Sequence, residues 1–484
     1  MIIQFLLISF LFNLVCSQTS TPSNKDVTCW CEKTPYTRQC IHHLTIITRE
    51  RVSPIIIRDN REFLRATLNA IIVESKKLRD NAKLFESTSS RSKAAWSECS
   101  NLYDLTLIQL EQTLDNSNNH TDFDTQTWLS AASTNIHTCL SGFSELGFDI
   151  QEDQTDHTNL SKNITALIRN ALAINRDWSE KAITTSNNVP RRYFLNTNVD
   201  DSHNPHVVVA KDGSGNYGTV VEAINALGGQ TPNGKTYVIH IKSGVYKENI
   251  VIPVGLNNIM MVGEAVYGSG FQARGISFLN TAGPEGGQSV ALASLSDCSI
   301  FYGCSFEGYQ DTLYAQSNRQ FYRDCVITGT VDFIFGNAAA VFQKCSIYTN
   351  TQDGVHTNVI AAHGRESPHE NTGFSFQNSK VIASYDTFLG RPWKPYARTA
   401  YLETYLGGKI NPAGWLMYHD ESDWNTLCYR EYKNYGTGSS IRNRVNWNGY
   451  RVMNDVEAEE YSVEKLIDGL SWLPESNIPF SVGL

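Results

Sequence analysis

The fold is decided by one repeated stretch. It reads Phe301-Tyr302-Gly303-Cys304-Ser305-Phe306, then Phe321-Tyr322-Arg323-Asp324-Cys325-Val326-Ile327, then Phe342-Gln343-Lys344-Cys345-Ser346-Ile347. Each copy holds a short apolar strand followed by turn residues, and the cysteines recur at positions 304, 325 and 345. A short period of this kind predicts a solenoid in which parallel strands stack one above another.

Two aspartates occupy the same place in consecutive repeats, because Asp311 lies seven residues after Cys304 and Asp332 lies seven after Cys325. Equivalent positions of neighbouring rungs lie about 4.8 Å apart. The repeat therefore predicts two stacked carboxylates, of which one should have a raised pKa and the other a low one. Such a pair suits an acid beside a nucleophile or base. A stack that only caps turns or binds a cation is the alternative.

Five motifs occur in a fixed order along this part of the chain, and two of them contain these aspartates. They are Gly244-Val245-Tyr246-Lys247-Glu248, Gln288-Ser289-Val290-Ala291-Leu292, Tyr309-Gln310-Asp311-Thr312-Leu313, Gly329-Thr330-Val331-Asp332-Phe333-Ile334-Phe335-Gly336 and Leu389-Gly390-Arg391-Pro392-Trp393. Together they resemble the motifs of plant pectin methylesterases, over roughly residues 205–484. The resemblance implies a right-handed parallel β-helix. It also implies hydrolysis of the methyl esters of cell-wall homogalacturonan to pectate and methanol.

Carried onto this chain, the resemblance assigns a role to each polar residue of these motifs. Asp332 is the expected nucleophile, and Asp311 is the expected acid and base. Gln288 and Gln310 are expected to donate amide N–H groups to the developing oxyanion. Arg391 is expected to hold Asp332 and keep it ionised. Gln288 and Arg391 are also expected to contact the substrate.

Two tryptophans, Trp393 and Trp415, are candidate platforms for sugar rings, because an aromatic face suits the apolar face of a pyranose. The alternative for both is that they only pack on the outside of the helix. The histidines form no metal-ligand pattern, so neither a metal nor a cofactor is expected. The stacked cysteines are within disulfide range whichever neighbours pair, and the resemblance implies Cys325–Cys345.

The N-terminal part of the chain has a different character. Residues 1–17 read as a signal peptide, an apolar run that ends in small residues, and no later stretch is apolar enough to span a bilayer. From 25 to 185, apolar residues recur at helical spacing, for example over 63–72 and 128–140. This pattern predicts an all-α, up-and-down four-helix bundle before the all-β domain.

The cysteine spacing of this helical region resembles that of pectin methylesterase inhibitor domains. The resemblance implies two disulfides, Cys31–Cys40 and Cys99–Cys139, and leaves Cys29 as either a free thiol or a competitor of Cys31. Glycosylation sequons occur in the same region at three asparagines, Asn119, Asn159 and Asn163.

Residues 186–205 form a polar linker, and the β-helix domain follows over 206–484. Within the linker, Arg191 and Arg192 form a dibasic pair that is a candidate processing site. The mature protein is expected to be a secreted monomer of the cell wall. Its substrate is pectin, and its other partner is an inhibitor domain in the same or another molecule. The formal charge of −9 gives no basis for binding nucleic acid.

One departure from the family lies between Gly263 and Gly270, which are separated by only six residues. Family members usually carry roughly 25 more residues there, close to one whole rung. Among those residues are a Thr and a Phe that face the substrate beside Gln288. Losing a whole rung lets the remaining strands pair in register, so the expected result is a folded protein with weaker binding of the polymer.

Three other readings remain. A pectin lyase would need acidic clusters for Ca²⁺ and a basic proton abstractor, and a galacturonase would need a different set of acids. Gln288, Gln310 and Arg391 fit neither of these enzymes well. The third reading is a secreted, non-catalytic pectin-binding or inhibitor protein with a degenerate catalytic domain.

Overall fold

The computed structural model describes residues 24–50, 57–84, 90–115, 120–145, 155–183, 205–228, 237–242, 244–253, 256–262, 270–351, 357–417 and 424–484. The proposed signal peptide, the dibasic pair Arg191 and Arg192, and the sequon at Asn119 lie outside these residues. The chain divides into two compact units, Met1–Pro190 and Arg191–Leu484, and each is described by itself.

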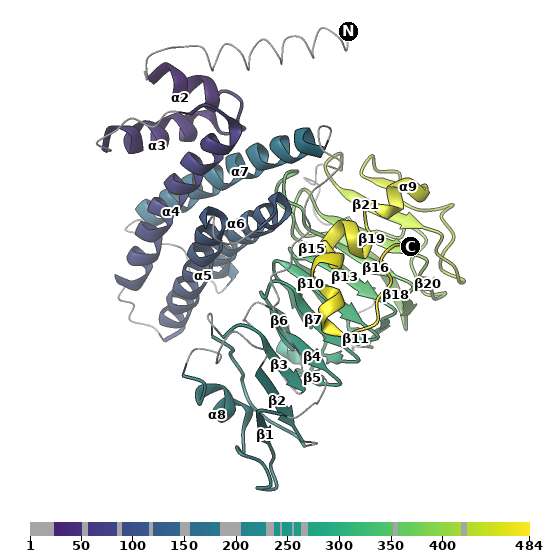
Figure 1. Cartoon of the computed structure of the whole chain (residues 1–484). Coiled ribbons are helices and arrows are strands. Elements are labelled where there is room, and N and C mark those ends of the chain that lie inside the picture. The colour runs from purple at the N-terminus through teal and green to yellow at the C-terminus, as the bar shows by residue number, and fades with distance from the viewer. Residues whose placement is uncertain are drawn as a thin grey trace. The chain divides into compact units, whose positions relative to one another are not determined.

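Within the described residues, the first unit contains six helices (Figure 1), which are α2 (Asn24–Cys31), α3 (Thr37–Glu50), α4 (Asn60–Leu84), α5 (Ser90–Leu114), α6 (Asp122–Glu145) and α7 (Thr155–Ile183). The four long helices close into a ring, because α4 packs on α5 and α7, and α6 packs on the same two helices. The predicted four-helix bundle is therefore present, and the short α2–α3 hairpin is an addition to it. No helix among the described residues is long and apolar enough to cross a membrane.

Both disulfides predicted for this unit are confirmed. Cys31–Cys40 joins α2 to α3 with a Cα–Cα distance of 5.5 Å, and Cys99–Cys139 joins α5 to α6 with a distance of 5.0 Å. Cys29 is also disulfide-bonded, so it is not a free thiol. It does not displace Cys31 from its bond either.

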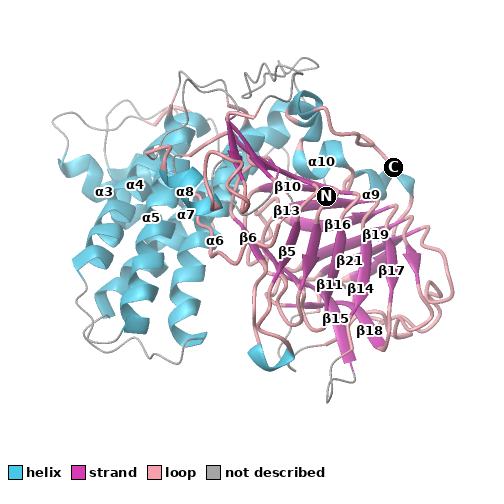
Figure 2. Ribbon diagram, turned by 90° about the horizontal axis from the view of Figure 1, so that it is seen from below, coloured by secondary structure: helices cyan, strands magenta, loops and turns pink. Residues whose placement is uncertain are grey.

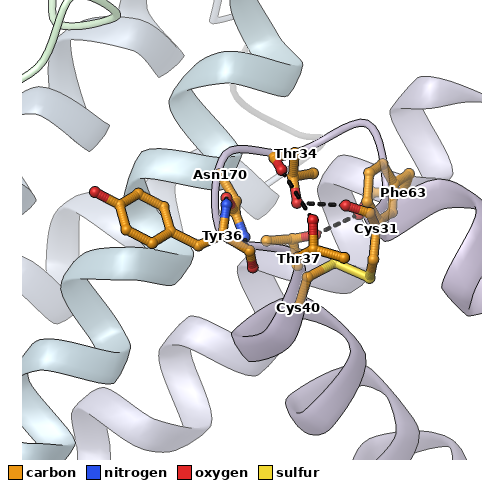
Figure 3. The surroundings of a disulfide bond; sticks show 8 residues. Cys31, Thr34, Tyr36, Thr37, Cys40, Phe63 and Asn170 are labelled. Carbon is orange, nitrogen blue, oxygen red and sulfur yellow. Dashed lines mark hydrogen bonds between the residues drawn. A yellow bond between two sulfur atoms is a disulfide. The ribbon is translucent and has the colours of Figure 1, made fainter.

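The α2–α3 turn is tied to the bundle by hydrogen bonds beside the first disulfide (Figure 3). The backbone N–H of Tyr36 donates to Asn170 Oδ1 at 2.8 Å, and Asn170 Nδ2 donates back to the Tyr36 carbonyl at 3.0 Å. Thr34 Oγ1 closes the turn by donating to the carbonyl of Cys31 at 2.7 Å. The sequons at Asn159 and Asn163 lie four residues apart on α7, where the first is exposed and the second half-buried.

The second unit consists of three parallel sheets (Figures 1 and 2). Sheet A has the order β1-β2-β3-β4-β7-β10-β13-β16-β19-β21-β22, sheet B the order β18-β15-β12-β9-β6, and sheet C the order β20-β17-β14-β11-β8-β5. From β4 to β20, successive strands of the chain visit the three sheets in turn. Every strand pair is parallel and joins one turn to the next, for example β10 to β13. The chain therefore forms the predicted parallel β-helix.

The strand bounds are β1 (Val207–Val209), β2 (Tyr237–Ile241), β3 (Ile259–Val262), β4 (Gln272–Arg274), β5 (Ser277–Leu279), β6 (Leu292–Ser294), β7 (Ser299–Tyr302), β8 (Ser305–Glu307), β9 (Leu313–Ala315), β10 (Arg319–Arg323), β11 (Val326–Gly329), β12 (Ile334–Gly336), β13 (Ala339–Gln343), β14 (Ser346–Thr349), β15 (Thr357–His363), β16 (Gly373–Gln377), β17 (Lys380–Ile382), β18 (Asp386–Pro392), β19 (Arg398–Leu402), β20 (Tyr405–Leu406), β21 (Cys428–Tyr432) and β22 (Tyr450–Val452).

Aromatic rings at equivalent positions stack through the interior. The column contains Phe301, Tyr322, Phe342, Phe376 and Tyr401, whose successive ring centroids lie 4.8, 4.6, 4.7 and 4.5 Å apart. All five side chains are fully buried. Each stacked pair contributes about 0.5–1.5 kcal/mol beyond the burial of its surface, so the repeat stabilises the stack that it specifies.

The predicted Cys325–Cys345 disulfide is wrong, because both residues are free thiols, as is Cys304. Each thiol instead donates a hydrogen bond to a carbonyl of the preceding rung. Cys325 Sγ reaches Phe301 O at 3.3 Å, and Cys345 Sγ reaches Tyr322 O at 3.5 Å.

The next two rungs make the same bond with hydroxyl groups. Ser379 Oγ donates to Phe342 O at 3.1 Å, and Thr404 Oγ1 donates to Phe376 O at 3.3 Å. The position shared by Cys325, Cys345, Ser379 and Thr404 therefore holds a small side chain. Its sulfur or hydroxyl oxygen donates a hydrogen bond to a backbone carbonyl of the preceding rung. This orientation directs each Sγ at a backbone oxygen instead of at the neighbouring sulfur.

The stack is continuous across the short connection between β3 and β4. Met260 of β3 pairs with Gln272 of β4, which in turn pairs with Ile300 of β7. Sheet A thus continues past the departure from the family, as expected from the loss of a whole rung. Sheets B and C have no strand from this connection among the described residues, and they begin at β6 and β5.

Short helices cover parts of this unit. Helix α8 (Val220–Asn225) packs beside β1, and its N-cap Thr219 forms a capping box with Glu222. The C-terminal segment contains α9 (Asp455–Glu459), α10 (Val463–Ile467) and two short 3₁₀ turns, η4 (Gly469–Ser471) and η5 (Leu473–Ser476). Its apolar side chains pack on the outer face of sheet A.

Candidate active site

Asp311 and Asp332 lie on consecutive rungs, each two residues before a strand, β9 and β12 respectively. These strands pair with Leu313 opposite Ile334, so the two aspartates fall opposite each other in the same register. The backbone N–H of Asp311 donates to the carbonyl of Val331 at 3.2 Å. The stacking predicted from the repeat is therefore present.

Both aspartates have a left-handed backbone, with φ of 62° at Asp311 and 51° at Asp332. Aspartate tolerates this region better than most residues, but the conformation still has a free-energy cost. Both residues are buried, with exposed fractions of 8% and 5%. Gly336 follows on the same rung, and a Cβ there would lie 1.9 Å from the carbonyl oxygen of Ala315. Only glycine lets the two rungs approach this closely beside the aspartates.

Arg391 of β18 forms an ion pair with Asp332. Its Nε lies 2.9 Å from both Oδ1 and Oδ2, and its Nη2 donates to Oδ2. Nη1 donates to the carbonyl of Pro392 at 3.1 Å, which fixes the plane of the guanidinium. Strand β15 lies between β12, which follows Asp332, and β18, which carries Arg391. Its residue Ala362 is in register with Phe335 on one side and with Arg391 on the other. A small side chain there leaves room for the arginine to reach across one rung.

The electrostatic balance at Asp332 differs from the expectation. Burial raises the pKa of the Asp332 carboxyl, and the hydrogen bonds and charge of Arg391 oppose that rise. We expected a low pKa from the arginine alone, but desolvation of the buried carboxylate is the larger effect. Arg391 therefore limits the rise in the pKa of Asp332. By doing so, the arginine favours the ionised form of the Asp332 carboxyl.

The two glutamines flank the aspartates on the N-terminal side. Gln288 and Gln310 pair as an isolated parallel bridge, and the N–H of Ser289 donates to the Gln310 carbonyl at 3.1 Å. Gln310 directly precedes Asp311 and is half-buried, whereas Gln288 is exposed. Gln288 stands on the first rung of sheet B, next to the departure from the family.

An aromatic wall stands on the other side of the aspartates. Tyr314 and Phe335 stack with ring centroids 4.4 Å apart and planes within 2°. The ring of Trp393 meets both edge-on, at 6.4 Å from Tyr314 and 5.8 Å from Phe335. Lys394 Nζ lies 5.5 Å from the centroid of the Trp393 ring.

Trp393 is half-buried, as a sugar platform should be. The sequence analysis assigned no role to Tyr314 or Phe335. They occupy equivalent places in the same repeat as the two aspartates, and that signal could have identified them.

The substrate-binding role predicted for Trp415 is wrong. Its side chain is only 1% exposed and belongs to the core of the β-helix. Its ring stacks on Tyr429 with centroids 4.1 Å apart. Trp415 pairs with Gly390 as an isolated bridge, and its ring lies beneath that glycine. It therefore supports the strand of Arg391 from inside, where a polymer cannot reach it.

Comparison with known proteins agrees with this arrangement. A sequence profile described as Pectinesterase matches residues 206–266 and 264–470, and one described as Plant invertase/pectin methylesterase inhibitor matches residues 25–174. The match to the first profile is interrupted at the short connection between β3 and β4.

Two curated relatives and one solved structure are similar to this chain. "Pectinesterase 2" of Citrus sinensis is 40% identical over 96% of each chain. "Probable pectinesterase/pectinesterase inhibitor 17" of Arabidopsis thaliana is 39% identical over 97% of each chain. The solved structure "Pectin methylesterase from Carrot" is 41% identical, with a TM-score of 0.55, and the match covers 58% of this chain and 98% of that one. With its stacked aspartates, its arginine and both of its matched domains, the chain belongs to the pectinesterase family.

Proposed function

We propose that the chain removes methyl groups from pectin by a two-step acyl transfer centred on Asp332. The reaction class follows from its family, which consists of carboxylic ester hydrolases. The observation that supports these roles is the pairing of Asp332 with Arg391 while Asp311 lies in register on the neighbouring rung. Arg391 is a fixed cationic partner of Asp332, and Asp311 has a different environment. An acid and a nucleophile need such different environments, because these separate their pKa values.

In the first step, a carboxylate oxygen of Asp332 attacks the carbonyl carbon of the methyl ester. The C–O bond to methoxide breaks, and an anhydride forms between Asp332 and the polymer. Asp311 gives its proton to the departing methoxide, which leaves as methanol. Gln288 and Gln310 donate N–H groups to the carbonyl oxygen while it carries negative charge.

In the second step, Asp311 accepts a proton from a water molecule, which attacks the anhydride. The bond between the acyl carbon and the Asp332 oxygen breaks, and Asp332 returns as a carboxylate. The polymer keeps a free carboxyl group. Each turnover therefore yields one methanol, one polymer carboxylate and one proton, with Asp311 protonated again. The aromatic wall of Tyr314, Phe335 and Trp393 offers apolar surface for neighbouring sugar rings.

The direct test is methanol release from methyl-esterified pectin by the purified chain, with the acid released followed in parallel. Equal molar amounts of methanol and acid are the expected result. A shortening of the polymer, or a new unsaturated end, would instead indicate a glycosidase or a lyase.

The pH dependence should report the pairing of Asp332 with Arg391. Asp332 attacks only as an anion, so kcat/KM falls as pH decreases through its pKa. Arg391 lowers that pKa, and removing the cation therefore raises it. In Arg391→Gln the acid limb of the kcat/KM profile should move to higher pH. Lys394→Gln is the control, because it removes a cation beside Trp393. An unshifted acid limb in Arg391→Gln would contradict the role given to the arginine.

The short connection between β3 and β4 should weaken binding of the polymer more than chemistry. The described part of sheet B begins at β6, and Gln288 beside it is exposed. The strands that follow Asp311 and Asp332, β9 and β12, are paired on both sides, and β18 of Arg391 pairs with β15. Kinetics on pectin beside the carrot enzyme should therefore show a raised KM and a smaller change in kcat. A chain that is folded by circular dichroism yet releases no methanol at any pectin concentration would instead favour a non-catalytic pectin-binding protein.

The inhibitor-type domain over residues 25–185 is proposed to hold the enzyme inactive, or to assist its secretion to the cell wall, until the linker is cut. Changing Arg191 and Arg192 together to alanine should leave an uncleaved precursor. Its mass should be near the 54.2 kDa of the whole chain before glycans are added and after the signal peptide is removed. Immunoblotting of secreted protein checks this result. Recovery of the usual processed fragment from the double variant would exclude this site.

A further inference from the structure

A second cluster of reactive groups lies away from the aspartates, on the outer face of sheet A. It surrounds Cys428, the first residue of β21, which is half-buried and is not in a disulfide. Cys428 is the direct register partner of Arg398 on β19. Arg430 follows two residues later, so its side chain leaves β21 on the same face as Cys428.

Three guanidinium groups act on this thiol, and they belong to Arg398, Arg430 and Arg365. These guanidinium groups donate hydrogen bonds to backbone carbonyls. Arg398 donates to Glu460 O, Arg430 to Tyr429 O and Gly449 O, and Arg365 to Glu370 O and Pro368 O. Among the described residues, none of the three forms an ion pair with a carboxylate. Among the residues that the structure describes, no carboxylate therefore neutralises this positive charge at contact distance.

Two acidic residues approach the cluster without pairing to it. Glu460 is exposed and meets Arg398 through its carbonyl, so its carboxylate is screened by water. Glu370 lies near Arg365, but its Oε2 accepts hydrogen bonds from Asn337 Nδ2 at 3.0 Å and from the backbone N–H of Glu366, and its Oε1 has no hydrogen-bond partner among the described residues. Burial raises the pKa of Glu370, which makes it a poor counter-ion.

A buried phenol completes the cluster. The hydroxyl of Tyr461 lies 3.1 Å from Cys428 Sγ, and its side chain is only 4% exposed. The guanidinium of Arg398 lies over the same ring, 4.5 Å from its centroid. A buried hydroxyl needs an acceptor, and a thiolate accepts a hydrogen bond far better than a neutral thiol does.

From this geometry we propose that Cys428 is present as a thiolate and is the site at which a hydroperoxide oxidises this protein. The thiolate is the natural anion for the three guanidinium groups and the natural acceptor for Tyr461. Cys428 is also partly exposed, whereas Cys304, Cys325 and Cys345 are buried inside the stack.

The electrostatics point the same way. Burial alone would raise the pKa of Cys428, but Arg398, Arg430, the Tyr461 hydrogen bond and Arg365 together outweigh it, and the pKa is lowered. The interior cysteines show the opposite behaviour, because burial and neighbouring thiols raise the pKa of Cys304 and Cys325. Lowered pKa and access to solvent are the two properties that make a cysteine reactive.

The proposed step is a two-electron oxidation. The Cys428 thiolate attacks one oxygen of the hydroperoxide, and an S–O bond forms as the O–O bond breaks. The sulfur is oxidised to a sulfenic acid. The peroxide is reduced, and its other oxygen leaves as hydroxide or alkoxide, which takes a proton from solvent.

Cys298 provides a matched control within the same chain. It is also half-buried and not in a disulfide, but the carboxylate of Asp297 accepts a hydrogen bond from its backbone N–H at 3.0 Å. The native full chain is treated with iodoacetamide across a pH series and, separately, with hydrogen peroxide in the presence of dimedone. Peptide mass spectrometry then measures the labelling of each cysteine.

At pH 7, Cys428 should be alkylated at least about tenfold faster than Cys298, with a rate midpoint below the ordinary cysteine value of about 8.5. The dimedone adduct should appear on Cys428 first. Tyr461→Phe removes only the hydroxyl, so it should slow both reactions and move the midpoint to higher pH. Equal rates at Cys428 and Cys298, or a midpoint unaffected by Tyr461→Phe, would overturn the proposal.

Discussion

Asp332→Asn should abolish the release of methanol while leaving the β-helix folded. The amide that replaces the carboxylate cannot form the acyl intermediate, and it leaves the guanidinium of Arg391 without its anion. Turnover should fall to the detection limit at every pectin concentration, because the attacking atom itself is lost. Methanol release and far-UV circular dichroism of the purified variant check both parts of this expectation.

Asp324→Asn is the matched control for this change. Asp324 is another aspartate with a left-handed backbone, with φ of 53°, at a corner of the same repeat, but it is exposed and stands outside the motif of the aspartate pair. It should retain normal turnover. Wild-type-like activity in Asp332→Asn would show that Asp332 is not the nucleophile. Equal losses in both variants would point to damage to the fold.

Asp311→Asn should reduce kcat by about 10²–10⁴-fold, the usual contribution of a positioned proton donor. The amide cannot protonate the departing methoxide or accept a proton from water. The loss should depend on the leaving group, because an acidic alcohol needs less help to depart. With an aryl ester of galacturonate, the first step should recover while the second, which needs Asp311 as base, stays slow.

This difference between the steps gives a way to observe the intermediate. When Asp311→Asn is mixed with the aryl ester, a burst of the released phenol should precede slow turnover. Mass spectrometry of the quenched protein should find the acyl group on the peptide that contains Asp332. A loss that is the same for methyl and aryl esters, with no burst, would mean that Asp311 acts structurally and does not transfer protons.

Much of the fold could be predicted from periodicity alone. The recurrence of Cys304, Cys325 and Cys345 predicted stacked strands, and the equal offsets of Asp311 and Asp332 predicted their register. Local repeats are reliable here because each rung pairs only with its neighbours. Helical spacing likewise predicted the long helices of the first unit. Arg391 was a different case: it lies 59 residues from Asp332, and only the resemblance to a family connected the two.

Two predictions failed because they depended on the direction of a side chain. The repeat brought Cys325 and Cys345 close enough for a disulfide, but each Sγ points at a carbonyl of the rung before it. Trp415 was predicted to face the substrate, but it follows an irregular turn, where strand alternation gives no guide to inside and outside. It lies in the core against Tyr429.

The amino-acid sequence by itself determined the two-domain organisation, the stacking of rungs and the register of the aspartate pair, because these follow from short-range periodicity. Only the tertiary structure decided the ionisation balance at Asp332 and the placing of Trp393 against the stacked rings of Tyr314 and Phe335. Both depend on groups brought together from different rungs. The pKa of a buried carboxyl reflects the sum of its desolvation and its partners, and that sum exists only once the chain has folded around it.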